Sequence, residues 1–92
     1  MKFEWDKNKA QSNEKKHQVS FSEASSVFAD PFELTVVDPD HSSDEYRFIS
    51  IGKSRMGRLL IVSYTERELD SIRIISARSA TQREQKYYAQ KH

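Results

Sequence analysis

Three apolar segments follow one another in the C-terminal half of the chain with very short connections between them. They are Tyr46–Gly52, Arg58–Glu66 and Ser71–Ala77, all rich in residues that favour β-strands. The connections Lys53–Gly57 and Arg67–Asp70 hold five and four residues. A parallel pairing needs a crossover of about a dozen residues or more. The three segments are therefore predicted to form an antiparallel meander.

The N-terminal part of the chain is expected to add a short strand and a helix. Lys2–Trp5 alternates in polarity, which predicts a strand with Phe3 and Trp5 on one side. Asp6 is a suitable N-cap for a helix that runs through Lys16, because its carboxylate can accept hydrogen bonds from the free amides of the first turn. This helix has little apolar surface and should lie on the outside of the domain.

A second helix is predicted between Ser20 and Asp30. Ser20 and Glu23 have the spacing of a capping box, in which the serine accepts from the helix and the glutamate reaches back to the cap. Asp30 should end the helix, because the residue before a proline avoids the helical region. Four apolar residues share one helical face and should pack inward: Phe21, Ala24, Val27 and Phe28.

The remaining segments complete an α+β fold with the order β-α-α-β-β-β-β-α. Phe32–Asp38 is predicted to be a strand and Pro39–Glu45 a polar loop. A final helix should run from about Ala80 to Gln90, and its start offers two possible capping boxes, Ser79–Gln82 and Thr81–Glu84. We expect one domain over residues 1–92, a twisted antiparallel sheet with two N-terminal helices and one C-terminal helix.

The composition excludes several classes of protein. The chain has 92 residues and no cysteine, so it has no disulfide framework, no thiol nucleophile and no cysteine-ligated zinc site. No window approaches the roughly 18 apolar residues of a membrane span, and the N-terminus lacks the apolar stretch of a signal peptide. We therefore expect a soluble, cytoplasmic protein without a metal or another cofactor.

Charge is distributed unevenly along the chain. Residues 1–46 hold five Lys/Arg and ten Asp/Glu, a net charge of −5, whereas residues 47–92 hold ten Lys/Arg and four Asp/Glu, a net charge of +6. Two interpretations are open. The charges can pair within the molecule, or the basic half can present a face to a nucleic acid or an acidic partner.

Strand alternation predicts where the arginines project. Thr65 and Arg67 should share one face of their strand, and Arg73 should come close to them across the hairpin. In the last strand we expect Ile72, Ile74 and Ser76 to oppose Arg73, Ile75 and Ala77, with Arg78 just past the strand's end. Because like charges repel, the arginines need a counter-ion. The connecting turn offers Glu66, Glu68 and Asp70 as internal partners, and phosphate is the external alternative.

The chain offers each kind of group that RNA cleavage without a metal ion requires, a combination that many basic proteins also contain. The 2′-hydroxyl must lose a proton to a base, the phosphorus must have its extra negative charge stabilised, and the leaving 5′-oxygen must gain a proton. His17 or Glu66 can act as the base, and His17, Tyr87 or Tyr88 as the acid. The fixed cations would be Arg67, Arg73 and Arg78, and further RNA contacts would come from Lys16, Tyr64 and Tyr88.

Structural roles compete with each of these assignments. His17 ends a helix, where an imidazolium interacts well with the dipole. Arg73 can pair with a carboxylate of a neighbouring strand, and one of the two adjacent tyrosines should pack while the other is free to stack on a base. His41 lies in an acidic loop with Asp38, Asp40 and Asp44, for which a solvated turn is the preferred interpretation over a metal site.

The order of several short motifs resembles the BrnT toxins of bacterial type II toxin–antitoxin modules. The motifs are FEWD, KH, VSF and VF with DP in the N-terminal half, then ISIG, YTER and IRIISAR, and they extend from Phe3 to Tyr88. Two departures are Gln18, where the family usually has glycine after the histidine, and the length of the turn around Leu69. The first concerns the end of a helix, and such turns vary in length.

The resemblance implies a RelE-like fold and a ribonuclease activity that stops translation. It also implies a BrnA-type antitoxin with a ribbon-helix-helix domain, through which the complex would contact operator DNA. By motif position the functional residues would be His17, Glu66, Arg67, Arg73 and Arg78. Two alternatives stay open at this point: a module that holds an acidic segment or RNA without cutting it, and a structural domain with internally paired arginines.

Overall fold

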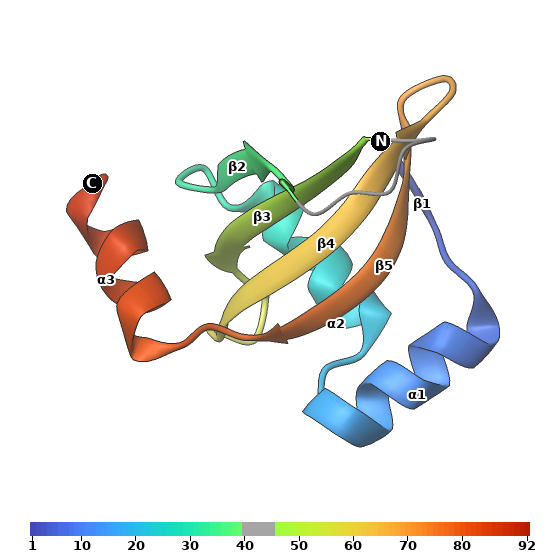
Figure 1. Cartoon of the computed structure of the whole chain (residues 1–92), viewed down its shortest axis with the longest axis horizontal. Helices are drawn as coiled ribbons and strands as arrows, with labels where there is room; N and C mark the ends of the chain where they lie inside the picture. Colours follow the sequence, from blue (N-terminus) through green and yellow to red (C-terminus); the bar gives the residue numbers. More distant parts are fainter. Residues whose placement is uncertain (40–45) are drawn as a thin grey trace.

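The computed structural model describes residues 1–39 and 46–92 and contains one five-stranded sheet with helices around it (Figure 1). The strand order is β1-β5-β4-β3-β2. The elements in chain order are β1 (Lys2–Glu4), α1 (Lys7–His17), α2 (Phe21–Ser25), the 3-10 helix η1 (Ser26–Ala29), β2 (Leu34–Val37), β3 (Arg47–Lys53), β4 (Leu59–Arg67), β5 (Ser71–Ser79) and α3 (Gln82–Gln90). Of the predicted loop Pro39–Glu45, residues 40–45 lie outside the described part of the chain.

The predicted meander is confirmed, and the sheet is mixed rather than wholly antiparallel. Strands β2, β3, β4 and β5 pair antiparallel in succession, whereas β1 pairs parallel to β5. The parallel pair sets Phe3 beside Ile72 and Glu4 beside Arg73. The short turns predict only that strands consecutive in the sequence pair with one another. The pairing of β1 with β5 joins opposite ends of the chain, so it could not be predicted in this way. β1 therefore places Glu4 beside an arginine of the last strand.

One face of the sheet packs against the N-terminal helices and forms the core. Phe21 from α2 and Val27 from η1 are buried there, and Figure 1 shows α2 lying behind the strands. The predicted inward face of the second helix is thus confirmed, with Phe28 partly buried against the same cluster. We call this side the core face, and its buried cluster is Val19, Phe21, Ala24, Val27, Leu60, Val62, Ile74 and Ala77.

The second helix is shorter than predicted, and its capping box is only half formed. Ser20 accepts a hydrogen bond from the Glu23 amide at 3.0 Å. The Glu23 side chain does not reach back to the cap. It is buried and accepts from Ser54 Oγ at 2.7 Å and from Arg58 Nε at 2.9 Å. The Arg58 hydrogen bond is the main reason why the pKa of Glu23 lies below its usual value. Glu23 thus anchors α2 to the turn between β3 and β4.

Helix α1 attaches to the edge of β5 mainly through one polar side chain. Asp6 caps α1 as predicted, accepting from the amides of Asn8 and Lys9 at 2.8 and 3.0 Å. Asn13 is the one buried residue of the helix. Its amide accepts from the Ala77 N–H at 3.1 Å and donates to the Ala77 carbonyl at 2.8 Å. Asn13 therefore continues the ladder of β5 beyond the end of β1.

Helix α3 has no buried residue and is fastened by polar contacts. Its capping box is Thr81–Glu84, the second of the two predicted, with both reciprocal hydrogen bonds present. Tyr88 donates from its hydroxyl to Asp30 Oδ2 at 2.6 Å. Figure 1 shows the helix standing at one side of the sheet beyond β3. The exposed surface of α3 follows from its composition, which is polar around most of its circumference.

Candidate functional site

The second face of the sheet carries the arginines that the sequence pointed to. We call it the outer face, the side opposite α2 and η1. Paired residues of neighbouring strands project to the same side. The register pairs Thr65 with Arg47 of β3 on one side and with Arg73 of β5 on the other. Arg47, Thr65 and Arg73 thus form one row across the sheet, and Glu4 of β1 extends it.

A β-bulge in β5 brings Arg78 to the same face. Ser63 pairs with Ser76 but Tyr64 pairs with Ile74, so Ile75 is an extra residue. Arg73 and Arg78 are five positions apart and would project to opposite faces in a regular strand. The predicted alternation is therefore wrong beyond Ile74: Ala77, not Ser76, turns into the core. Arg78 also lies within β5, not past its end.

Arg67 and Arg73 meet at one carboxylate, that of Glu4. Glu4 Oε1 lies 3.2 Å from Arg67 Nε and 4.0 Å from Arg73 Nη1. The side chains are 46%, 47% and 38% exposed for Glu4, Arg67 and Arg73, respectively. Two positive charges thus share one negative charge at a surface that solvent reaches. We call these three residues the Glu4 cluster.

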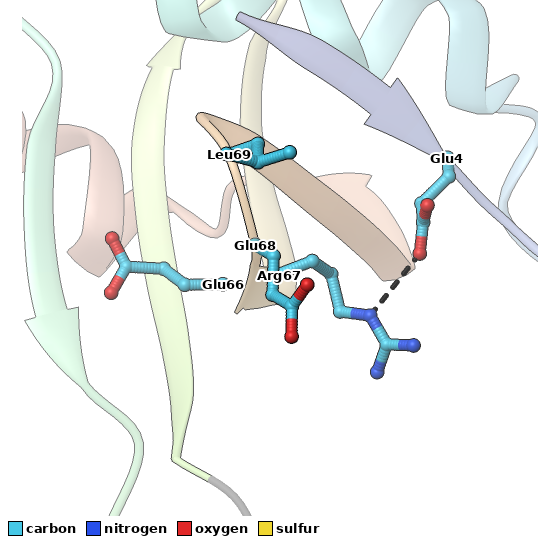
Figure 2. Close-up of a pocket in the computed structure, with 5 residues that line it drawn as sticks. All are labelled: Glu4, Glu66, Arg67, Glu68 and Leu69. Carbon is cyan, nitrogen blue, oxygen red and sulfur yellow. Dashed lines mark ion pairs between the residues drawn. The ribbon is translucent and has the colours of Figure 1, made fainter.

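Glu4 and Arg67 of the cluster line an open depression of about 760 Å³ at the end of β4, together with Glu66, Glu68 and Leu69 (Figure 2). Figure 2 shows Arg67 extended toward Glu4, whereas Glu66 points away from both. Glu66 pairs with Ile72 in the register and so projects to the opposite side from Arg67. Asp70 pairs instead with the N-terminal amine at 3.1 Å. The counter-ion of the arginines is therefore Glu4, not the acids of the connecting turn.

Arg78 is held by an internal partner. Its guanidinium donates two hydrogen bonds to Glu84, at 2.8 and 2.9 Å. This contact, more than any other, lowers the pKa of Glu84 to about 2. Glu84 also closes the capping box of α3 by accepting from the Thr81 amide at 2.9 Å. Arg78 therefore links β5 to α3 through a bidentate pair, which leaves it less available to a phosphate than Arg67 or Arg73.

His17 and Lys16 line a separate groove of about 340 Å³ between α1 and the bulge of β5. The groove includes Ser76, which lies five residues from the Arg67 partner Ser71. At about 3.3 Å per residue, that distance along β5 is roughly 16 Å. His17 is therefore not brought together with Arg67 and Glu4. The sequence grouped these residues because it gave no distances between the helix end and the hairpin.

The two tyrosines proposed as RNA contacts have structural partners. Tyr64 is buried on the core face, where its ring lies 5.0 Å from the Phe28 ring and 5.6 Å from the Phe48 ring. Burial and then the hydrogen bond to Asp30 raise the pKa of Tyr88 to about 12. Tyr64 is thus a core residue, and Tyr88 would release its proton with difficulty. Tyr87 is 43% exposed on α3.

Sequence reasoning missed two residues of the outer face. Glu4 was overlooked because nothing local indicates that β1 pairs with β5, although its alternation with Phe3 placed it opposite the core. Arg47 was overlooked because its place in the row depends on the register between β3 and β4, which the sequence does not show. Arg47 Nε and Thr65 Oγ1 are buried without a hydrogen-bond partner in the part of the structure that is described. These two polar atoms are neighbours of the Glu4 cluster in the row across the sheet.

Two further observations concern metals and membranes. The described ranges, 1–39 and 46–92, hold no group of three or more His, Asp or Glu side chains placed to bind a metal ion. Asp40, His41 and Asp44 of the acidic loop lie outside those ranges. None of the helices in the same ranges has the length and apolarity that crossing a membrane requires.

Comparisons with known proteins agree with the fold and the motifs. The chain is similar to the Brucella abortus ribonuclease toxin BrnT, whose crystal structure it matches with a TM-score of 0.65 and 26% sequence identity. The match covers 89% of this chain and 99% of that one. No curated protein matches the chain. The family model described as the ribonuclease toxin BrnT of type II toxin–antitoxin systems matches residues 5–84. The chain therefore belongs to the BrnT family of type II toxin–antitoxin ribonuclease toxins.

Proposed function

We propose that this chain is an endoribonuclease that cleaves RNA without a metal ion and inhibits translation in the cytoplasm. The observation that supports this most is the Glu4 cluster on the outer face. Arg67 and Arg73 share one carboxylate and are partly exposed. The three residues together carry one net positive charge, and a phosphate can approach the two exposed guanidinium groups, although Glu66 and Glu68 line the depression beside them. Arg78 does not offer such a free charge, because its guanidinium already donates two hydrogen bonds to Glu84.

The geometry suits transfer of a phosphoryl group within RNA. Attack of a 2′-hydroxyl on the adjacent phosphate adds negative charge to the phosphoryl oxygens in the transition state. Guanidinium groups fit these oxygens with directed hydrogen bonds. They stabilise the charge most when they are already in place. We assign this role to Arg67 and Arg73, and contacts to the flanking RNA backbone to Lys16 and His17.

The family implies that the toxin has an antitoxin partner, and the type of antitoxin is our proposal. Membership of a type II toxin–antitoxin family implies an antitoxin partner and an RNA substrate. We propose a BrnA-type antitoxin with a ribbon-helix-helix domain that covers the Glu4 cluster. The toxin would contact operator DNA only through this antitoxin.

Cleavage of labelled RNA by the purified chain in EDTA tests the catalytic part of this proposal. We expect cleavage by the wild type and a loss of about 100-fold or more in Arg67→Ala and Arg73→Ala, the effect of removing one transition-state donor. Arg83→Ala is the matched control, because Arg83 is an exposed arginine of α3 away from the cluster. Cleavage that needs an added metal ion would contradict the mechanism. RNA that is bound but never cut would indicate a binding module.

A further inference from the structure

We infer that Glu4 is the general base that removes the proton from the attacking 2′-hydroxyl. This inference rests on the proposed ribonuclease activity and names the group that performs its first proton transfer. Of the two bases suggested by the sequence, His17 lies in a separate groove, and Glu66 lines the depression but its side chain points away from Arg67 and Glu4. Glu4 also lies just before the residues that the family model matches, which begin at Trp5.

The position of Glu4 is fixed by strand β1. Phe3 projects to the core face, where its ring lies 5.6 Å from the Phe28 ring. Glu4 must then project to the outer face, beside its register partner Arg73. Both ion pairs of Glu4 use Oε1. The shortest contact to each arginine is thus made by Oε1, and Oε2 has no hydrogen bond to the described residues, so we assign the proton to Oε2.

The other acids near the arginines are placed differently. Glu66 projects to the opposite side of the hairpin. Glu84 is engaged by Arg78, and Asp70 by the N-terminal amine. Glu68 lines the depression but forms no ion pair with Arg67 or Arg73. Among the residues that the structure describes, Glu4 is thus the carboxylate that contacts both arginines.

The reaction balances with these groups. The 2′-oxygen forms a bond to phosphorus as its proton passes to Glu4 Oε2. The bond from phosphorus to the 5′-oxygen breaks, and the leaving oxygen takes a proton from water. The products are a 2′,3′-cyclic phosphate and a free 5′-hydroxyl. Arg67 and Arg73 hold the phosphoryl oxygens, and Arg67 also orients the carboxylate.

Replacing Glu4 distinguishes a base from a counter-ion, because the two roles predict opposite changes. If Glu4 is the base, Glu4→Gln should lower kcat by about 100-fold or more. RNA affinity should stay the same or increase, because a negative charge is removed from the site. If Glu4 only neutralises the arginines, the same variant should cleave at the wild-type rate or faster. That result would overturn the inference.

The control is Glu14→Gln, which removes the same charge from the exposed surface of α1 and should leave kcat unchanged. Glu4→Asp keeps the carboxylate but retracts it by one methylene, and should cleave faster than Glu4→Gln but slower than the wild type. If Glu4→Gln does not fold, an unchanged kcat in Glu4→Asp overturns the inference.

The same assay tests the role of Glu4 separately from the proposed ribonuclease activity. Wild-type cleavage that is lost in Arg67→Ala but kept in Glu4→Gln would overturn the role of Glu4 alone. Absence of cleavage by the folded wild type would overturn both. If the products carry a 3′-phosphate that does not arise from a 2′,3′-cyclic phosphate, the 2′-hydroxyl is not the attacking group. That result would also exclude the proton transfer to Glu4.

Discussion

The arginines of this sheet are held by carboxylates in two distinct ways. Arg78 donates two hydrogen bonds to Glu84, and Arg58 pairs with the buried carboxylate of Glu23. Removing the arginine from such a pair leaves a partly or wholly buried charge without a partner. Arg67 and Arg73, in contrast, share one half-exposed glutamate. The first pairs stabilise the fold, and the second group leaves charge available for a ligand.

The Arg78–Glu84 pair predicts how stability depends on pH. The pKa of Glu84 is about 2 in the folded chain, against a reference value of 4.5. Its contribution is therefore present above pH 4.5 and is lost as the pH falls toward 2. The shift corresponds to about 3 kcal/mol. Because Arg78 is 41% exposed, solvent screening should reduce this to about 1 to 2 kcal/mol.

Urea unfolding at about pH 5 and about pH 3 measures this contribution. The free energy of unfolding of the wild type should fall more between the two conditions than that of Glu84→Gln, which cannot titrate. Equal losses in the two proteins would show that the pair contributes nothing to the acid sensitivity of the fold.

Two elements, α1 and β5, are joined where the alternation of β5 changes. The sequence predicted Ala77 on the side of Arg73, because a bulge leaves no mark in a run of apolar and small residues. In the structure the Ala77 side chain lies in the core, and the Ala77 N–H and carbonyl form hydrogen bonds with the Asn13 side-chain amide. The bulge at Ile75 thus decides both which residue fills the core and on which face Arg78 emerges.

Asn13→Ala should destabilise the fold by about 2 to 3 kcal/mol. The substitution leaves the Ala77 N–H and carbonyl and the Val19 carbonyl without their side-chain partner, and buried polar groups are costly when unpaired. Chemical denaturation measures the loss, and Ser12→Ala on the exposed side of the same helix is the control. A loss equal to that of Ser12→Ala would mean that Asn13 does not hold α1 to β5.

At the scale of the whole molecule, the sequence predicted the meander because its turns were too short for anything else. Strands β3, β4 and β5 and the capped ends of the helices follow from local rules of this kind. The parallel pairing of β1 does not, because its partner lies some 70 residues away along the sequence. The sequence therefore named the arginines of the candidate site but did not indicate Glu4.

The uneven charge of the chain predicts that RNA binding depends on salt. Each phosphate neutralised in a single-stranded RNA contributes about 0.7 to the slope of log affinity against log salt concentration. Arg73→Ala should lower that slope by about this amount, whereas Arg78→Ala should change it little, since Glu84 already occupies its guanidinium. Titration of a 2′-O-methyl RNA, which cannot be cleaved, measures both slopes. Equal reductions would show that the internal pair opens to bind RNA.

Above all, we propose that Arg67 lies in a ribonuclease site. Expression of the wild type, Arg67→Ala and Arg83→Ala in bacteria, with mapping of new RNA 5′ ends during growth, tests it most directly. Growth arrest with new ends is expected from the wild type and from Arg83→Ala, and neither from Arg67→Ala when it is soluble and folded. New ends at an undiminished level with Arg67→Ala would show that Arg67 is not part of the site that cuts RNA.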